Sequence, residues 1–102
     1  MSAHNRRLDL SRDAVRDISD ALLYTRRRWG ANQRSRYKAA IDEALRLLTQ
    51  FPELGILGDD LQHNLRAIPV EQHVIYYSVH PDSIRVERVL HNRSDSLNVF
   101  TP

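Results

Sequence analysis

Apolar residues recur at three- and four-residue spacing through two stretches in the first half of the chain, and this pattern predicts two helices. The first stretch follows Ser11, which suits an N-cap, and ends at Gly30, where a left-handed backbone would stop a helix. We expect the second helix to be capped by Asn32 and to end before Pro52. Because only two or three residues connect the helices, they must fold back on each other as an antiparallel hairpin.

The remaining apolar segments are short, and their patterns predict strands. We expect strands at residues 6–10, 65–70, 73–80 and 84–91, a loop at 53–64 and a turn at 81–83. The segment HVIYYSVH at 73–80 is the strongest strand candidate, because it is dense in β-branched and aromatic residues. Pro69 in the preceding strand indicates an edge, a bulge or an early stop. The tail from Asn92 has little periodicity.

These elements predict an α+β fold in which a helical hairpin packs on one face of a small antiparallel sheet that includes the N-terminal strand. The strand at 73–80 is apolar on both faces. Val74 and Tyr76 fall on one face, and Ile75, Tyr77 and Val79 on the other. Two helices cover one face only, so the other is covered either by the tail of this chain or by a partner.

Length and composition restrict the class of protein. The 102 residues suit a single domain over 1–102, with 41% hydrophobic residues and ordinary charge. The absence of cysteine excludes a disulfide scaffold, a thiol nucleophile and a Cys-ligated metal, and is compatible with a cytoplasmic location. No apolar run approaches the ~18 residues of a membrane span, and no signal peptide opens the chain, so no membrane partner is expected.

The net charge of +2 hides an asymmetry between the halves of the chain. Residues 1–51 hold 11 basic and 6 acidic side chains, whereas residues 52–102 hold 4 and 7, and Lys38 is the one lysine among the 15 cations. The segment 26–38 carries six of these cations and no acidic residue, so it could hold phosphates. The alternative is a solvated hairpin end with Trp29 and Tyr37 in the core.

A set of His and Arg residues in the β-rich half could carry chemistry. Its members are Arg66, His73, Arg88, His91 and Arg93. His moves protons near neutral pH and Arg stabilises charge growing on a phosphate, which are the tools of RNA cleavage. The alternative is that these are polar strand ends, or arginines paired with Glu71, Glu87 or Asp95. The histidines have no metal-ligand spacing, and no glycine loop cradles a phosphate, so neither metal nor cofactor is expected.

Five segments in a fixed order also carry a family resemblance, which runs from about Leu8 to Asp95. They are Ala14…Asp17-Ile18…Tyr24-Thr25…Arg28-Trp29-Gly30, FPELG at 51–55, LRAIPV at 65–70, HVIYY at 73–77 and VLHNRSD at 89–95. This series resembles the ParE branch of the RelE/ParE toxin superfamily. The resemblance implies a toxin of a type II toxin–antitoxin module, and the strand, hairpin and sheet order agrees with the fold of that superfamily.

The two branches of the superfamily differ in their chemistry. RelE-like members cleave mRNA on the ribosome with Lys and Arg of the sheet and a Tyr near the C-terminus. In this chain the first sheet Arg falls on His73, the late-strand Arg falls near Arg93, and Val99 or Phe100 stands in place of the Tyr. The lysine positions are empty, so most of the acid, base and charge-stabilising groups are missing. His73 and His91 could substitute for them, which keeps a ribonuclease as the alternative.

ParE-like members instead poison DNA gyrase without an active site of their own, and a small acidic antitoxin, often ribbon–helix–helix, wraps them with its C-terminal part. The resemblance therefore implies a cytoplasmic gyrase inhibitor that forms a toxin–antitoxin hetero-oligomer. A degenerate member that only binds antitoxin is a further alternative. The residues expected to contact a partner are Arg66, Tyr76, Arg88, His91 and Arg93.

Overall fold

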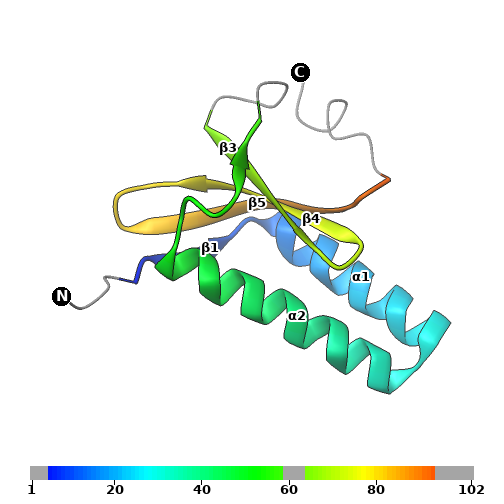
Figure 1. Cartoon of the computed structure of the whole chain (residues 1–102). Coiled ribbons are helices and arrows are strands. Elements are labelled where there is room, and N and C mark those ends of the chain that lie inside the picture. Colours follow the sequence, from blue (N-terminus) through cyan, green and yellow to red (C-terminus); the bar gives the residue numbers. More distant parts are fainter. Residues whose placement is uncertain (1–4, 59–63, 94–102) are drawn as a thin grey trace.

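A five-stranded sheet and a helical hairpin make up the computed structural model, which describes residues 5–58 and 64–93. The elements are β1 (Arg7–Leu10), α1 (Arg12–Trp29), α2 (Ala31–Gln50), β2 (Ile56–Leu57), β3 (Leu65–Val70), β4 (His73–Val79) and β5 (Ser83–His91). The strand order is β1-β5-β4-β3-β2, and both helices lie on one side of the sheet (Figure 1). Within the described residues, neither helix is long and apolar enough to cross a bilayer.

A single residue connects the two helices. Gly30 has φ 98° and serves as both the C-cap of α1 and the N-cap of α2. This left-handed backbone is open to glycine at little cost, so the chain reverses without a longer loop. The predicted cap at Asn32 is therefore wrong, because α2 has already begun at Ala31. At the other end of α1 the predicted cap is confirmed, since the Ser11 hydroxyl accepts a hydrogen bond from the Ala14 N–H at 2.9 Å.

The sheet is mixed, although an antiparallel sheet was predicted. Consecutive strands from β2 to β5 pair antiparallel. β1 instead pairs parallel with β5, in a register that sets Arg7 opposite Ser83. The alternation of residues in a strand specifies its faces and carries no information on its direction. β2 lies inside the segment expected to be loop, and its two residues are too few to produce a periodic pattern.

The main core lies between the helices and the sheet. It is built on Ala14 and Leu22 of α1, Ile41, Leu45 and Leu48 of α2, and Ile75, Tyr77, Ile84, Val86 and Val89 of the strands. Tyr77 is fully buried, and its hydroxyl donates to the Pro52 carbonyl at 2.7 Å and accepts from the Gly55 N–H at 2.7 Å. A Cβ on Gly55 would lie 2.5 Å from that hydroxyl, so the position requires glycine. This junction fixes the chain where α2 leads into the sheet.

The opposite face of the sheet carries a second, smaller apolar cluster. Leu65, Tyr76 and Leu90 are buried there, with Ala67 and Val74 packed against them. The prediction that β4 is apolar on both faces is thus confirmed, because Ile75 and Tyr77 belong to the main core and Tyr76 to this cluster. The tail that was expected as one of two possible covers lies largely outside the described residues. A partner on this face stays a prediction.

Candidate functional site

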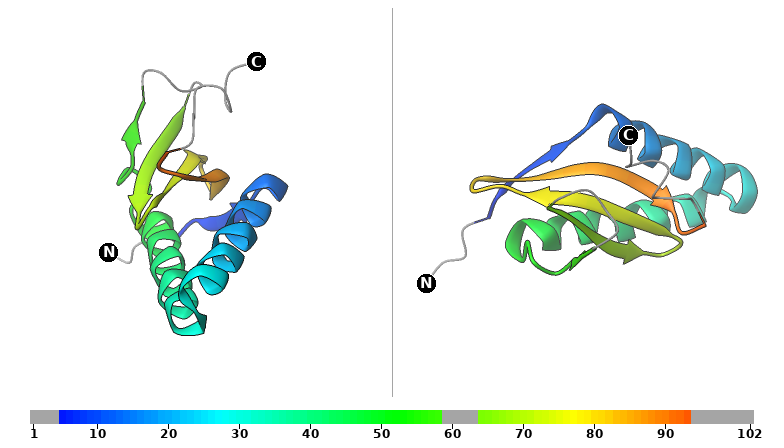
Figure 2. Two further views of the ribbon diagram at one scale, coloured as in Figure 1. Left: turned by 90° about the vertical axis from the view of Figure 1, so that its right-hand side faces the viewer. Right: turned by 90° about the horizontal axis from the view of Figure 1, so that it is seen from above.

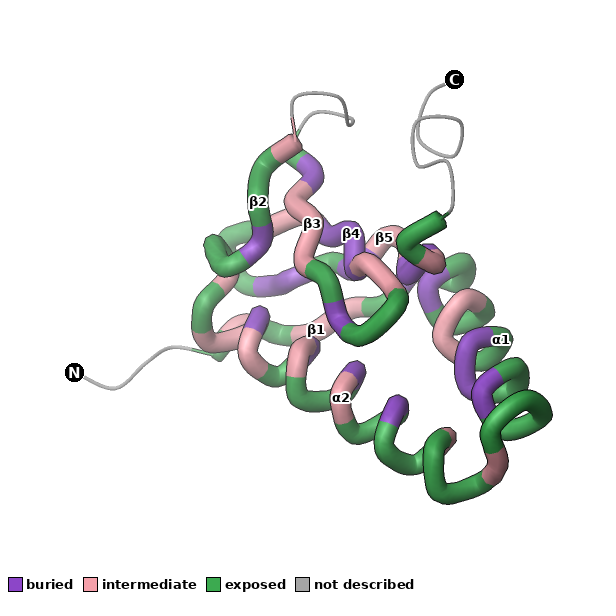
Figure 3. The backbone as a smooth tube through the Cα atoms, turned by 45° about the vertical axis from the view of Figure 1, so that its right-hand side comes forward, coloured by how far each residue is buried: buried purple, intermediate pink, exposed green. Residues whose placement is uncertain are grey.

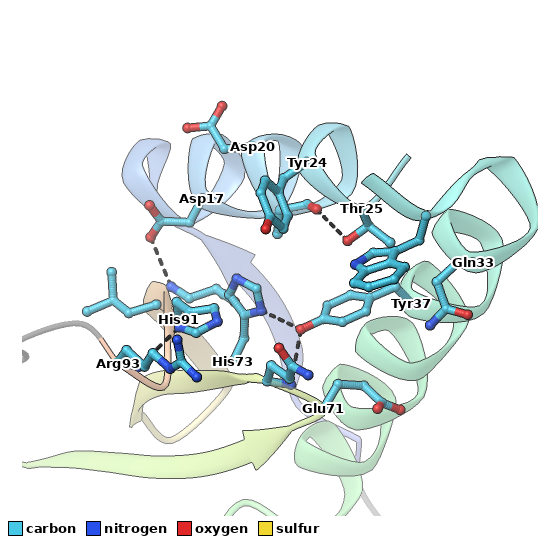
Figure 4. Close-up of a pocket in the computed structure, with 15 residues that line it drawn as sticks. Asp17, Asp20, Tyr24, Thr25, Gln33, Tyr37, Glu71, His73, His91 and Arg93 are labelled. Carbon is cyan, nitrogen blue, oxygen red and sulfur yellow. Dashed lines mark hydrogen bonds between the residues drawn. The ribbon is translucent and has the colours of Figure 1, made fainter. Parts of the chain in front are cut away.

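An open cavity of about 880 Å³ lies between the two helices and the end of the sheet. The helices diverge from their connection at Gly30 towards the sheet (Figures 2 and 3). α1 supplies one wall with residues from Asp17 to Trp29, and α2 supplies Gln33 and Tyr37. The turn between β3 and β4 and the end of β5 form the floor, where His73, His91 and Arg93 lie (Figure 4).

An ion pair anchors the first wall of the cavity to β5. The Asp17 carboxylate accepts from the Arg88 guanidinium at 2.8 and 3.1 Å and from the Val89 N–H at 2.9 Å. A bulge in β5 prepares this contact, since the register moves from Tyr77 opposite Val86 to Tyr76 opposite Arg88. The carboxylate raises the pKa of Arg88, chiefly through their hydrogen bond. Both side chains are largely buried, so the pair holds α1 against the edge of β5.

A tyrosine and a histidine connect the second wall to the floor. The Tyr37 hydroxyl accepts from the Gln72 N–H at 3.2 Å, and it contacts Nδ1 of His73 at hydrogen-bond distance (Figure 4). Because the hydroxyl accepts from the backbone, its own proton is available for Nδ1, which assigns the Nε2–H tautomer to a neutral His73. Glu71 adopts φ 53° beside this contact, a left-handed conformation that costs a non-glycine residue about 1–2 kcal/mol. Strained backbone of this kind is typical of functional sites.

His91 lies next to His73 on the floor. The two residues are paired across β4 and β5, and their rings meet edge to face with centroids 5.3 Å apart. Nδ1 of His91 accepts from the backbone N–H of Arg93 at 3.1 Å. Burial, and to a lesser degree the neighbouring His91, lowers the pKa of His73, while burial raises the pKa of Tyr37. At neutral pH the Tyr37–His73 contact is therefore a neutral pair.

The structure distributes the predicted site residues over three places. His73, His91 and Arg93 line the cavity together, whereas Arg88 supports its wall through Asp17. Arg66 lies on β3 and donates to the Gly55 carbonyl at 2.8 Å, and Tyr76 belongs to the cluster on the opposite face. Neither Glu71 nor Glu87 is the ion-pair partner of Arg88, and Asp95 lies outside the described residues.

Most residues of the cavity were not predicted as site residues, among them Asp17, Tyr24 and Tyr37. The sequence singled out Asp17 and Tyr24 only as parts of the family motif. It singled out Tyr37 as a core position at the end of the cationic segment 26–38. The core prediction for Tyr37 is confirmed, but its hydroxyl reaches the floor of the cavity. Trp29 was expected in the core as one alternative, and this is wrong: its side chain is 65% exposed at the end of α1. An amphipathic stripe identifies a helix face and cannot tell whether its last residue passes beyond the partner helix.

The cavity is lined by polar and aromatic groups in a pattern that suits binding of a polar ligand or a peptide. Within residues 5–58 and 64–93 no group of three or more His, Asp or Glu side chains is placed to hold a metal ion. The donors that remain available on the floor are the Nε2–H groups of the two histidines and the Arg93 side chain. Asp20 and Glu71 are also among the lining residues.

The sequence profile described as "ParE toxin of type II toxin-antitoxin system, parDE" matches residues 8–96, a range that contains every residue lining the cavity. This chain belongs to the ParE toxin family. It is 32% identical over 84 residues to Toxin ParE1 of Caulobacter vibrioides, covering 80% of this chain and 84% of that relative. It is 31% identical over 69 residues to Toxin ParE1 of Mycobacterium tuberculosis, covering 67% of this chain and 70% of that relative.

The fold of this ParE-family chain is also found among solved structures. One described as "Chromosomal ParDE TA system from P. aeruginosa" matches with a TM-score of 0.71, at 19% identity, over 86% of this chain and 97% of that chain. At this identity the match speaks for the fold alone. The family resemblance and the α+β fold class predicted from the sequence are both confirmed.

Proposed function

We propose that this ParE-family chain is the toxin of a type II toxin–antitoxin pair, that it inhibits DNA gyrase, and that a cognate antitoxin neutralises it. The match to the ParE toxin family over residues 8–96 is the observation that carries the proposal. The family resemblance supplies the target, and the chain lacks the terminal Tyr and the sheet lysines of the ribonuclease branch.

The geometry of the cavity favours binding over catalysis. Nδ1 of His73 is engaged by Tyr37, and Nδ1 of His91 is engaged by the Arg93 N–H. Each ring is thus left with Nε2 as its donor, whereas a general base needs an unprotonated nitrogen facing its substrate. Burial lowers the pKa of His73, which disfavours the imidazolium that would act as a general acid. This arrangement supports a toxin that acts by occupying a surface of its target.

Antitoxin binding is supported by the apolar edge of the sheet beside β2. Phe51, Leu54, Ile56 and Leu57 are all exposed there, with Ile56 at 76%. β2 is a short edge strand, and edge strands present unpaired backbone groups to a second chain. Arg66 lies opposite Leu57 on β3 and adds a cation beside this edge, which suits an acidic antitoxin.

A supercoiling assay with purified gyrase tests the proposed target. The chain should inhibit supercoiling at stoichiometric amounts and should increase the amount of cleaved DNA–gyrase complex. The control is the same amount of chain mixed beforehand with a purified cognate antitoxin, which should restore supercoiling. Full activity of gyrase in a molar excess of folded chain would overturn the gyrase proposal.

The second candidate function is ribosome-dependent mRNA cleavage. One observation favours it: His73, His91 and Arg93, which the sequence grouped as the catalytic alternative, line one cavity. Growth arrest and mRNA cleavage should then both disappear in the variant H73A/H91A/R93A, provided its circular dichroism matches that of the parent. Arrest that survives all three substitutions would eliminate the ribonuclease. Absence of arrest in the parent chain itself would identify a member that only binds antitoxin.

A further inference from the structure

The arginines at the connection of the two helices have no ion-pair partner among the residues that the structure describes. We define the hairpin tip as residues 26–38. The side chains of Arg26, Arg27, Arg28, Arg34 and Arg36 make no hydrogen bond or ion pair with any residue in 5–58 or 64–93. By contrast, Arg46 pairs with Glu43, Arg85 with Glu87 and Arg88 with Asp17. The tip is also mostly exposed (Figure 3).

Helix stability explains only part of this charge. Arg26, Arg27 and Arg28 stand in the last turn of α1, where a cation complements the helix dipole. Arg34 and Arg36 stand near the start of α2, where the dipole favours acidic residues, and the first turn of α2 holds none. Cations near the positive end of a helix dipole weaken the helix. A departure of this kind from a local rule is expected at functional sites.

The aromatic side chain at the tip adds to the pattern. Trp29 is 65% exposed, and the Arg28 guanidinium lies over its ring, 5.1 Å from the centroid. A cation held on an exposed indole keeps the guanidinium partly ordered at the surface. Ordering the donor in advance reduces the entropy lost when it binds an anion.

We propose that the hairpin tip binds the phosphate backbone of duplex DNA. Guanidinium groups match phosphate in geometry, and five unpaired ones in one place provide the charge for a salt-dependent site. Successive residues of a helix point about 100° apart, so Arg26, Arg27 and Arg28 surround the end of α1 rather than lining one face. A convex, charged end of this kind can contact phosphates on both sides of a groove. An anionic bilayer would instead require a flat helix face with its apolar residues turned to the lipid.

The tip adjoins the cavity, because Trp29, Gln33 and Tyr37 belong to both, but the rest of the cavity lining carries acidic groups. Asp20 and Glu71 line the cavity, and they would repel a polyanion that extended from the tip towards the histidines. Between residues 21 and 41 there is no acidic residue. We therefore expect the DNA contacts at the tip arginines, and this inference does not depend on gyrase being the target.

The test uses the only tryptophan of the chain, which lies inside the proposed site. A duplex of about 20 base pairs is titrated into the full chain while Trp29 emission is recorded at roughly 50 and 200 mM salt. Binding should change the emission, and the affinity should fall steeply with salt, by a slope of about 0.9 for each phosphate contacted. A single strand of the same sequence and vesicles containing anionic lipid are titrated in parallel.

Matched variants distinguish a site from general positive charge. The variant R26Q/R28Q/R36Q removes three unpaired arginines of the tip, and R7Q/R46Q/R85Q removes three exposed arginines that are paired elsewhere. The tip variant should lose at least about tenfold in duplex affinity and have a smaller salt slope. The control variant should change the affinity less than about twofold. Equal losses in the two variants, tighter binding to the single strand, or binding to vesicles without binding to DNA would each overturn the proposal.

Discussion

The two ends of the helical hairpin differ in how their polar groups are engaged. At the base, which comprises residues 11–17 and 48–55, Ser11 donates to the Glu87 carbonyl at 2.7 Å, and Asp17 accepts three hydrogen bonds from Arg88 and Val89. At the tip, five arginine side chains have no such partner in the described part of the chain. This difference indicates that the base is fixed by the fold and that the tip is available to another molecule. The loss in the free energy of unfolding should therefore be largest for substitutions at the base and smallest for substitutions at the tip.

The largest effect is expected for D17A at the base. The substitution leaves Arg88 partly buried without its counter-ion and the Val89 N–H without an acceptor. We expect a loss of about 3 kcal/mol in the free energy of unfolding, measured by urea denaturation. D9A is the matched control, because Asp9 pairs with Arg7 at the exposed surface and its loss should leave stability unchanged. A D17A variant as stable as D9A would contradict the description of the base.

G55A should have the next largest effect. The new Cβ would lie 2.5 Å from the Tyr77 hydroxyl in the fully buried junction behind α2. Overpacking of this kind costs about 1–3 kcal/mol, so the midpoint of thermal unfolding should fall clearly. The double variant G55A/Y77F removes the contact to the hydroxyl but keeps the ring carbons at 2.7 and 2.9 Å, so its loss of stability should be smaller than the sum of the two single losses. If the loss of stability in the double variant equalled the sum of the two single losses, the contact between the new Cβ and the hydroxyl would not be the cause of destabilisation.

Y37F probes the middle of the hairpin. It removes the hydroxyl that accepts from the Gln72 N–H and contacts His73, at a cost of about 1–2 kcal/mol. Since the hydroxyl proton stabilises neutral His73, its removal should raise the pKa of His73, measured by NMR titration of the ring proton. An unchanged pKa in a folded variant would show that the hydroxyl does not donate to Nδ1.

The pH dependence of stability should report on the same residue. Burial holds the pKa of His73 below its ordinary value of 6.5, so the unfolded chain takes up this proton more readily than the folded one. The stability is therefore complete above pH 6.5 and decreases as the pH falls towards the pKa of the folded state. The slope of unfolding free energy against pH should be smaller in H73Q than in the parent. Identical slopes would exclude His73 as the source.

The smallest effect is expected at the tip. R26Q/R28Q/R36Q removes side chains that the described fold does not use, so its unfolding midpoint should match or slightly exceed that of the parent. A clear loss of stability would mean that the tip arginines serve the fold, and it would remove the contrast between the two ends.

Local patterns predicted the elements well, because each depends on neighbouring residues. Ser11 and Gly30 mark the ends of α1, and the strand at 65–70 has the bounds that its sequence indicated. Two contacts could not be predicted in this way. The Asp17–Arg88 pair joins residues 71 positions apart, and the parallel pairing of β1 with β5 depends on the whole path of the chain. No periodicity records such distant pairings.

The candidate site was predicted less completely than the fold. His73, His91 and Arg93 were grouped by residue type, and the structure brings them into one cavity. Arg66 was grouped with them for the same reason and Tyr76 was expected to contact a partner, but strand alternation and strand order place both outside the cavity. Tyr37 shows the converse case: a core position on a helix carries a polar end that only the tertiary fold directs to His73.

The parallel pairing of β1 with β5 has a consequence for the synthesis of this toxin. β1 precedes both helices and lies beside β5, so Leu8 meets its partner Ile84 only after all the residues between them have been made. The helical hairpin can form early from local contacts, but the sheet cannot close until residues 83–91 emerge. A chain whose translation stops before this point has neither the anchor for Asp17 nor the floor of the cavity. Any activity that depends on the cavity is therefore absent from a chain that ends before β5.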